Sequence, residues 1–94
     1  MRLVNQELLT AFMKAHADAR GPTESWVAEV EAAAWQTQQD ATDRHASASF
    51  LHDRVAVFNI KGNAYRLVAK ISFKRGIVQV LKAGTHAEYD KWTL

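Results

Sequence analysis

The chain lacks cysteine altogether and has only one proline among its 94 residues. Without cysteine it can form neither a disulfide framework nor a thiolate zinc site, which fits a protein of the reducing cytoplasm. The sequence contains no phosphate-binding glycine loop and no serine nucleophile elbow. No apolar run is long enough to cross a membrane, and Asn5 and Gln6 interrupt the N-terminal apolar residues too early for a secretory signal. We therefore expect a cytoplasmic protein.

What the sequence does contain is typical of a folded domain. Apolar residues make up 48% of it, with three Trp and four Phe, and such a composition supports a packed core. A chain of this length buries one core, so we expect a single domain over residues 1–94.

Positive charge is concentrated in the second half of the chain. Residues 1–50 carry four basic and seven acidic side chains, a net charge of −3, whereas residues 51–94 carry eight basic and three acidic ones, a net charge of +5. An excess of this size favours a polyanionic partner such as nucleic acid, although ordinary solvated surfaces also show it.

The first half predicts two helices after a short strand at residues 2–4. Asn5 is expected to cap the first helix, and Gly21–Pro22 to end it. The second helix is expected over residues 23–39 and a polar loop over residues 39–49. The apolar stripes that define the two helices are Leu8, Leu9, Phe12 and Met13 in the first and Trp26, Val27, Val30, Ala33 and Ala34 in the second.

The second half predicts strands, beginning with a hairpin that turns at Gly62–Asn63. Pairing of Lys61 with Ala64 places Asn59 opposite Arg66 and fixes the remaining pairs. Because side chains alternate between the two faces of a sheet, one face is apolar and the helices should cover it. The other, open and basic face is expected to carry Asn59, Lys61, Arg66, Val68 and Lys70.

A second hairpin is expected to turn at residues 74–76, with Phe73 opposite Ile77. This register places Lys82 on the open face and Gly84 opposite Arg66, but it turns Gln79 inward. A two-residue loop would instead turn Lys82 toward the core. Burying its ammonium would cost far more free energy than burying the side-chain amide of Gln79.

Thr85 and Glu88 have the spacing of a capping box, which predicts a short terminal helix after the last strand. This register is expected to place His86 beside Arg66, and Tyr89 follows three residues later on the same helical turn. Cations, an imidazole and a phenol therefore converge on one surface, and this combination suits cleavage of RNA by its own 2′-hydroxyl. Arg66 can hold the phosphate oxygens, and His86 can transfer a proton near neutral pH.

Each residue of this group also has an ordinary structural interpretation. Arg66 alone would be read as a solvated cross-strand partner, and single lysines are surface residues by default. Tyr89 alone would be a half-buried anchor, and His86 a polar residue at a helix start. The other histidines, His16, His45 and His52, show no metal-ligand spacing, so we expect no metal site and no other cofactor.

Two C-terminal segments resemble the HigB toxin family of the RelE-like superfamily. They are Val57-Phe58-Asn59-Ile60-Lys61-Gly62-Asn63-Ala64-Tyr65-Arg66-Leu67-Val68 and Gly84-Thr85-His86-Ala87-Glu88-Tyr89-Asp90. Trp35 with Thr37 and Asp40 also resembles the family's segment at the end of the second helix. The resemblance therefore covers most of the chain, and its two C-terminal motifs are long and specific.

This resemblance implies an α+β fold in which two N-terminal helices pack on a twisted antiparallel sheet of three to four strands, with a short C-terminal helix. It further implies a toxin of a type II toxin–antitoxin system that cleaves mRNA, on the ribosome, and is silenced by a helix-turn-helix antitoxin of the HigA type. Arg66, His86, Tyr89 and Lys61 match the family's catalytic positions. The expected RNA-binding residues are Asn59, Lys70 and Lys82.

The sequence departs from the family pattern at two places. Lys82–Ala83 stands where relatives have a bulky apolar or aromatic pair, and Gln39 stands where they tend to have proline. Neither departure removes a candidate catalytic group. Two alternatives remain open at this point: a non-catalytic relative of the RelE or gyrase-poisoning ParE type, and a basic protein-interaction module.

Overall fold

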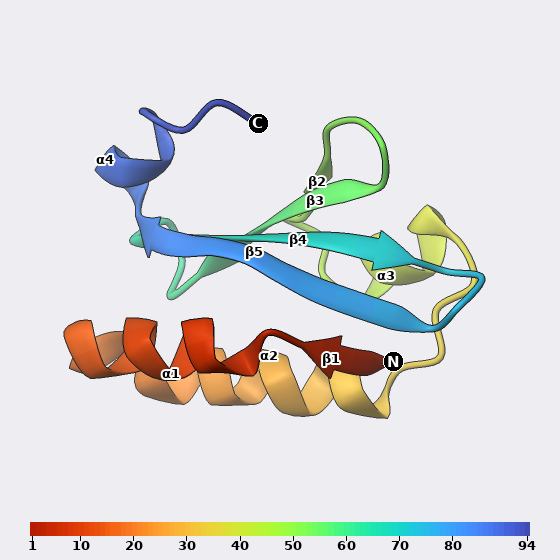
Figure 1. The fold of residues 1–94 in the computed structure, drawn as a ribbon, viewed down its shortest axis with the longest axis horizontal. Coiled ribbons are helices and arrows are strands. Elements are labelled where there is room, and N and C mark those ends of the chain that lie inside the picture. The colour runs from red at the N-terminus through yellow and green to blue at the C-terminus, as the bar shows by residue number, and fades with distance from the viewer.

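The computed structural model describes residues 1–94 as an α+β fold built on one five-stranded sheet (Figure 1). The strand order is β1-β5-β4-β3-β2, with β1 parallel to β5 and every other neighbouring pair antiparallel. The sheet is therefore mixed, and larger than the three to four antiparallel strands expected. In chain order the elements are β1 (Arg2–Val4), α1 (Gln6–Ala15), the 3-10 turn η1 (Ala17–Ala19), α2 (Arg20–Ala32), α3 (Gln38–Arg44), β2 (Ser49–Phe50), β3 (Val55–Ile60), β4 (Tyr65–Ser72), β5 (Ile77–Thr85) and α4 (His86–Tyr89).

The break between the first two helices lies earlier than the sequence suggested. α1 ends at Ala15, and His16 has a non-helical backbone (φ −131°, ψ 81°). The Gly21–Pro22 pair, expected to end a helix, lies inside the first turn of α2. Proline is tolerated there because the first backbone N–H groups of a helix have no acceptor within it.

The second helix is shorter than expected, and a third helix occupies the first part of the predicted loop. α2 ends at Ala32, and Trp35 in the following link is buried against the core. α3 begins after Thr37, whose hydroxyl accepts from the Asp40 N–H at 3.2 Å while the Asp40 carboxylate accepts from the Thr37 N–H. Because only Ala41 of this helix is buried, α3 has no apolar stripe in the sequence to reveal it.

Asn5 does not cap α1 with its side chain, contrary to expectation. Its backbone is left-handed (φ 68°), and its Nδ2 donates to the carbonyl of Val80 at 2.8 Å. The asparagine thus ties the connection between β1 and α1 to strand β5.

The hairpin of β3 and β4 has the predicted register. Asn59 pairs with Arg66 and Phe58 with Leu67, as the turn sequence indicated. Gly62 adopts the expected positive φ of 63°, and Lys61 beside it is left-handed as well (φ 53°). The turn chemistry therefore fixed the position of Arg66 on its strand.

The hairpin of β4 and β5 combines two registers through a β-bulge. Val68 pairs with Lys82 and Arg66 with Gly84, as expected, but Ser72 rather than Phe73 pairs with Ile77. The shift occurs where Leu81 is inserted between the partners of Val68 and Ala69. The expectation that Gln79 turns inward is wrong, because the bulge leaves Gln79 exposed while keeping the ammonium of Lys82 out of the core.

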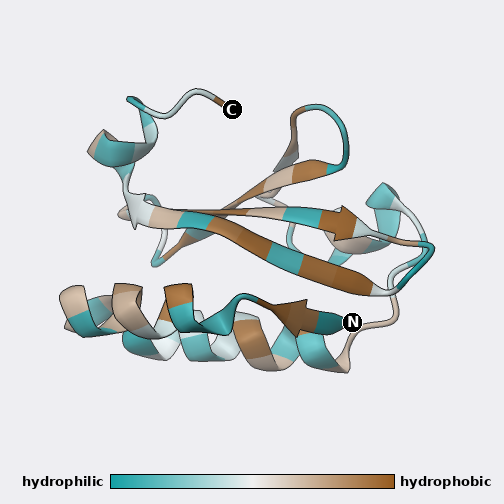
Figure 2. Ribbon diagram, viewed as in Figure 1, coloured by the Kyte–Doolittle hydropathy of each residue, from teal (hydrophilic) through white to brown (hydrophobic).

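The main core lies between the sheet and the helices α1, α2 and α3. Figure 1 shows α1 and α2 on one side of the sheet and α4 on the other. Figure 2 shows hydrophobic stretches along the neighbouring strands β1 and β5 and a hydrophilic turn between β4 and β5. The largest fully buried side chains include Phe58, Leu9, Leu67 and Ile71. We call the side away from α1 and α2 the second face; it carries Arg66, Val68, Lys70 and Ser72 on β4.

Candidate functional site

The capping box at the start of α4 is present as the sequence predicted. The Thr85 N–H donates to the Glu88 carboxylate at 2.9 Å, and the Glu88 N–H donates to the Thr85 hydroxyl at 3.1 Å. The hydrogen bonds from Thr85 lower the pKa of Glu88. The His86 N–H also donates to the Ala64 carbonyl at 3.2 Å, so α4 begins directly beside the turn of β3 and β4.

Gly84 lets the C-terminal segment pack closely on β5. A Cβ at this position would lie 2.9 Å from Oε1 of Glu88, closer than real Cβ atoms approach other atoms, and 3.0 Å from Cζ2 of Trp92, which is tighter than most Cβ contacts. The expectation that Gly84 lies opposite Arg66 was right, but the sequence did not show that a side chain there would displace the C-terminal segment.

Arg66 is held in place from two directions. Its Nη1 donates to the carbonyls of Asn63 (3.1 Å) and Tyr65 (3.3 Å), and its Nη2 donates to Oδ1 of Asn63 (3.2 Å). From the C-terminal side, the ring of Tyr89 lies 5.7 Å from the guanidinium carbon. Asn63, which the sequence indicated only as a turn residue, therefore orients the guanidinium, and Nε of Arg66 has no partner within the protein.

His86 lies at the first position of α4, and half of its side-chain surface is exposed. Its Nδ1 is 3.5 Å from a carboxylate oxygen of Asp90, one helical turn further on. No hydrogen bond joins His86 to Arg66; the two are brought near each other by the pairing of β4 with β5. Asp90 was not among the residues proposed from the sequence, although its i,i+4 spacing from His86 is a signal that could have identified it.

The second face is less open than expected, because the C-terminal residues cover part of it. Val55, Val57 and Val68 are buried there, and Leu81, Tyr89, Trp92 and Leu94 pack against them. We call Tyr89, Trp92 and Leu94 the C-terminal cover. Lys82 remains exposed beside this cover, with its ammonium 5.5 Å from the centre of the Trp92 ring.

The structure does not bring Lys61 to the surface that carries Arg66. Its ammonium binds the carboxylate of Asp18 at 2.7 Å, and the hydroxyl of Tyr65 donates to the same carboxylate at 2.5 Å. These contacts lower the pKa of Asp18, with the Lys61 hydrogen bond as the largest cause. Since Tyr65 belongs to the helix-covered face, the expectation that Lys61 shares the face of Arg66 is wrong.

The remaining predicted residues, Asn59 and Lys70, are both partly buried. Asn59 is half-buried opposite Arg66 on β3, and its side chain makes no hydrogen bond within the protein. Lys70 lies on the second face and binds the carboxylate of Asp53 at 3.0 Å, a contact that lowers the pKa of Asp53. Arg66, Lys82 and Tyr89 lie at one end of the second face, α4 begins with His86 beside the same hairpin turn, and Lys70 lies further along the face.

The structure contains neither a membrane-spanning helix nor a cluster of side chains that could hold a metal ion. None of the helices combines the length and the apolar character that spanning a bilayer requires. No three side chains among the histidines, aspartates and glutamates are grouped so that they could hold a metal ion.

Residues 19–92 match the family described as HigB_toxin, the RelE-like toxic component of a toxin–antitoxin system. The chain belongs to the HigB family of toxins. No curated protein matches it closely enough to count as a relative. HigB membership makes this chain the toxic member of a toxin–antitoxin system, so its partner is an antitoxin. The matched residues include Arg66, the start of α4 and Trp92, so the arrangement described above lies within the family domain.

Proposed function

We propose that this HigB-family toxin is an endoribonuclease that cleaves mRNA without a metal ion. The observation that carries the proposal is the fixed guanidinium of Arg66, held by Asn63 and Tyr89 beside the start of α4. A positioned guanidinium fork matches the geometry of phosphate oxygens. Family membership adds that the chain is a toxin.

The proposed reaction needs only groups of the RNA and of the protein. The 2′-oxygen forms a bond to the adjacent phosphorus as the bond from phosphorus to the 5′-oxygen breaks. A base accepts the proton of the 2′-hydroxyl, and an acid gives a proton to the leaving 5′-oxygen. The products are a 2′,3′-cyclic phosphate and a free 5′-hydroxyl.

Arg66 has the clearest role in this reaction. Its guanidinium donates to the non-bridging phosphate oxygens, whose negative charge grows in the transition state. Because Asn63 already orients the side chain, little rearrangement is needed when the phosphate arrives. Lys82 adds positive field from the neighbouring strand.

His86 and Tyr89 supply the proton-transfer groups in this proposal, with His86 as the general acid. Both emerge from α4, whose capping box sets their positions relative to Arg66. An imidazole can carry a proton near neutral pH, which suits protonation of the leaving oxygen. Asp90 can orient the imidazole through Nδ1. Lys61 is given no catalytic role, because Asp18 already binds its charge.

The proposed setting is the cytoplasm, with mRNA on the ribosome as substrate and a HigA-like helix-turn-helix antitoxin as the silencing partner. The absence of cysteine fits this compartment. The antitoxin is expected to present acidic residues to the basic second half of the chain. Asn59 and Lys70 are proposed to contact RNA outside the reacting phosphate.

Primer extension on ribosome-bound mRNA tests the proposal. The parent protein, freed of bound metal by EDTA and dialysis, is expected to produce discrete stops, and the folded Arg66→Ala variant is expected to produce none. Intact mRNA with both proteins, together with inhibition of DNA gyrase by the parent, would favour a gyrase-poisoning relative instead.

A further inference from the structure

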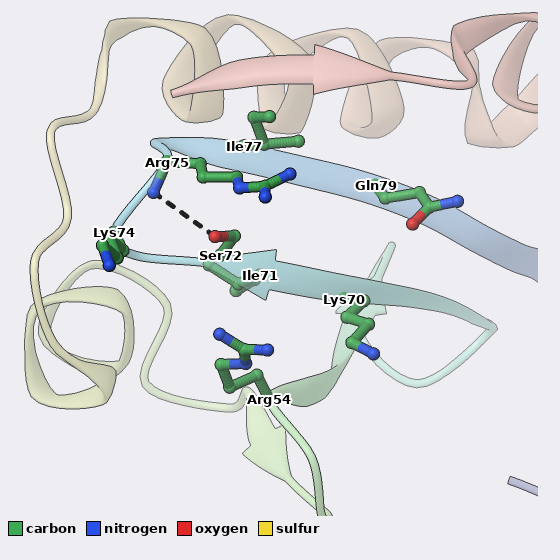
Figure 3. A pocket seen from close by; sticks show the side chains of 8 residues that line it. All are labelled: Arg54, Lys70, Ile71, Ser72, Lys74, Arg75, Ile77 and Gln79. Carbon is green, nitrogen blue, oxygen red and sulfur yellow. Dashed lines mark hydrogen bonds between the residues drawn. The ribbon is translucent and has the colours of Figure 1, made fainter.

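A basic hollow of about 440 Å³ lies at the end of the sheet away from α4. We call it the hairpin pocket, because the turn between β4 and β5 forms one of its walls (Figure 3). Four of its eight lining side chains are cations, Arg54, Lys70, Lys74 and Arg75, and none is acidic or aromatic. Ser72 and Gln79 add polar groups to the lining.

Local backbone structure places the two arginines on opposite sides of this pocket. Asp53 and Arg54 are both left-handed (φ 47° and 62°), a conformation that costs energy for residues other than glycine. The Arg54 carbonyl accepts from the Ile71 N–H at 3.0 Å, which fixes the turn against β4. Figure 3 shows the guanidinium of Arg54 approaching from below β4 and that of Arg75 lying along β5.

The turn between β4 and β5 is held by its own contacts. Gly76 supplies a positive φ of 67°, and the Arg75 N–H donates to the Ser72 hydroxyl at 3.3 Å. Lys74 and Arg75 are both exposed at this turn. A fixed backbone therefore presents two long cationic side chains at the rim of the pocket.

Most of the charge in the pocket is not neutralised by the protein. Lys70 binds Asp53 at 3.0 Å, but Arg54, Lys74 and Arg75 form no salt bridge with any carboxylate. Like charges gathered without counter-charges repel one another, and binding an anion relieves that repulsion. Three of the pocket's four cations are therefore free to bind an anionic ligand.

The chemistry of the lining selects phosphate oxygens over nucleobases. Arginine forks and ammonium groups bind phosphate, whereas single-stranded bases are held mainly by stacking on aromatic rings, which the pocket lacks. We propose that the hairpin pocket binds a backbone phosphate of single-stranded RNA outside the cleavage position. This inference rests on the proposed ribonuclease function, because it extends the binding track of the same substrate.

The position of the pocket on the sheet fits such a track. Lys70 follows Arg66 by four residues on β4, so the two side chains share the second face. At a rise of about 3.3 Å per residue they lie roughly 13 Å apart along the strand. One RNA strand can therefore reach both the pocket and Arg66 while passing beside the C-terminal cover.

Binding of a fluorescent 2′-O-methyl oligoribonucleotide of about fifteen residues tests the pocket, because this probe cannot be cleaved through its 2′-oxygen. The double variant Lys74→Gln with Arg75→Gln removes two pocket cations. The matched control, Lys14→Gln with Arg20→Gln, removes two exposed cations that line a small hollow between α1 and α2. Circular dichroism verifies that both variants fold, and Arg54→Gln provides a second, independent change.

The pocket variant is expected to bind the probe about tenfold more weakly than the parent, whereas the control binds within about twofold of it. The slope of log affinity against log salt should also become shallower by about 0.7 for each RNA phosphate that the variant no longer neutralises. Equal affinity and slope for the pocket variant, Arg54→Gln and the control would overturn the inference. Loss of binding to an acidic peptide, with RNA binding unchanged, would also overturn it and assign the pocket to a protein partner.

These results are distinguishable from a failure of the proposed function. If the parent cleaves no RNA but the pocket variant binds the probe more weakly, the ribonuclease proposal is wrong and the proposal that the hairpin pocket binds RNA is supported. If the parent cleaves RNA and the pocket variant binds the probe like the control, the ribonuclease proposal is supported and the proposal that the hairpin pocket binds RNA is wrong.

Discussion

The guanidinium of Arg66 lies over the ring of Tyr89, with Cζ 5.7 Å from the ring centroid. Arg66 belongs to β4 and Tyr89 to the last turn of α4, so this contact joins the sheet to the C-terminal helix across the candidate site. Asn63 holds the same guanidinium from the hairpin side. The cation is therefore fixed before any substrate binds, as electrostatic stabilisation of a transition state requires.

Replacing Arg66 by alanine should slow RNA cleavage by about 10²- to 10³-fold, because the variant has no positioned donor to the developing negative charge. Arg66→Lys should also be impaired, since an ammonium lacks the two-pronged geometry. Lys61→Ala is the matched control: it removes a cation from the same hairpin, but one already bound to Asp18. Single-turnover cleavage rates compare the three variants, and equal decreases for Arg66→Ala and Lys61→Ala would contradict the assignment.

Gly84→Ala should loosen the C-terminal segment. The added methyl would meet Glu88 and Trp92 at about 3 Å, and overpacking of this kind typically costs about 1–3 kcal/mol. Gly21→Ala is the control, because apart from its chain neighbours nothing lies within 4 Å of its Cβ position. Alanine favours helix there, whereas the following Pro22 disfavours a Cβ on helical backbone, so the two effects oppose each other. Urea unfolding should show a clearly lower midpoint for Gly84→Ala and a smaller change for Gly21→Ala. A midpoint unchanged in both would mean that the cover does not depend on the close approach at Gly84.

His86→Ala and Tyr89→Phe should each slow the chemical step while RNA binding changes little. Loss of a positioned acid or base usually lowers the rate by about 10²- to 10⁴-fold. His52→Ala, which removes an exposed histidine far from α4 in the sequence, should cleave at the parental rate. Parental single-turnover rates for both site variants would assign His86 and Tyr89 a structural role and leave catalysis to Arg66 and Lys82.

Stability should decrease as the pH falls from about 7.5 to about 5.5 because of His45. Burial lowers the pKa of His45, an effect larger than the opposing attraction of Glu29. A histidine whose pKa is lower in the folded chain contributes stability above its unfolded value of about 6.5, and this contribution disappears as the pH falls toward the folded value.

His45→Phe keeps an aromatic ring against Trp35 and Phe58 but cannot bind a proton. The urea midpoint of this variant should vary less between the two pH values than that of the parent. His52→Gln, at an exposed position, should keep the parental dependence. A dependence that is the same in all three proteins would show that His45 does not cause it.

The affinity of the cognate antitoxin should fall as salt concentration rises, through slower association. The second half of the chain carries a net charge of +5, and screening weakens long-range attraction between opposite charges. Stopped-flow association over a range of salt concentrations measures this effect. Tight binding that is indifferent to ionic strength would indicate an apolar interface on the helices instead.

Much of the site followed from local chemistry in the sequence. The turn at Gly62–Asn63 fixed the register of Arg66, and the spacing of Thr85 and Glu88 fixed the start of α4. Both signals act over a few residues, so they do not depend on the rest of the fold. Arg66 lies opposite Gly84 as predicted, but only because the bulge at Leu81 offsets the one-residue shift at the turn, where Ser72 and not Phe73 pairs with Ile77.

The errors arose where distant residues decide the outcome. Lys61 turns to the helix side because Asp18, 43 residues earlier, binds it. The bulge at Leu81 shifts the pairing of β4 with β5 by one residue. Neither the turn nor the far end of the hairpin indicates this shift in the sequence. The C-terminal cover packs closely because Gly84 has no side chain to keep Trp92 away. The periodicity of apolar residues in the sequence does not predict a contact of this kind.

The chemical nature of the RNA ends tests the central claim most directly. Mass spectrometry of fragments from a single-turnover reaction should find a 2′,3′-cyclic phosphate on one fragment and a 5′-hydroxyl on the other, with neither formed by Arg66→Ala. These ends follow from attack by the 2′-oxygen, whatever the buffer contains. Fragments that carry a 5′-phosphate and a 3′-hydroxyl, or no fragments at all from the parent, would contradict the account.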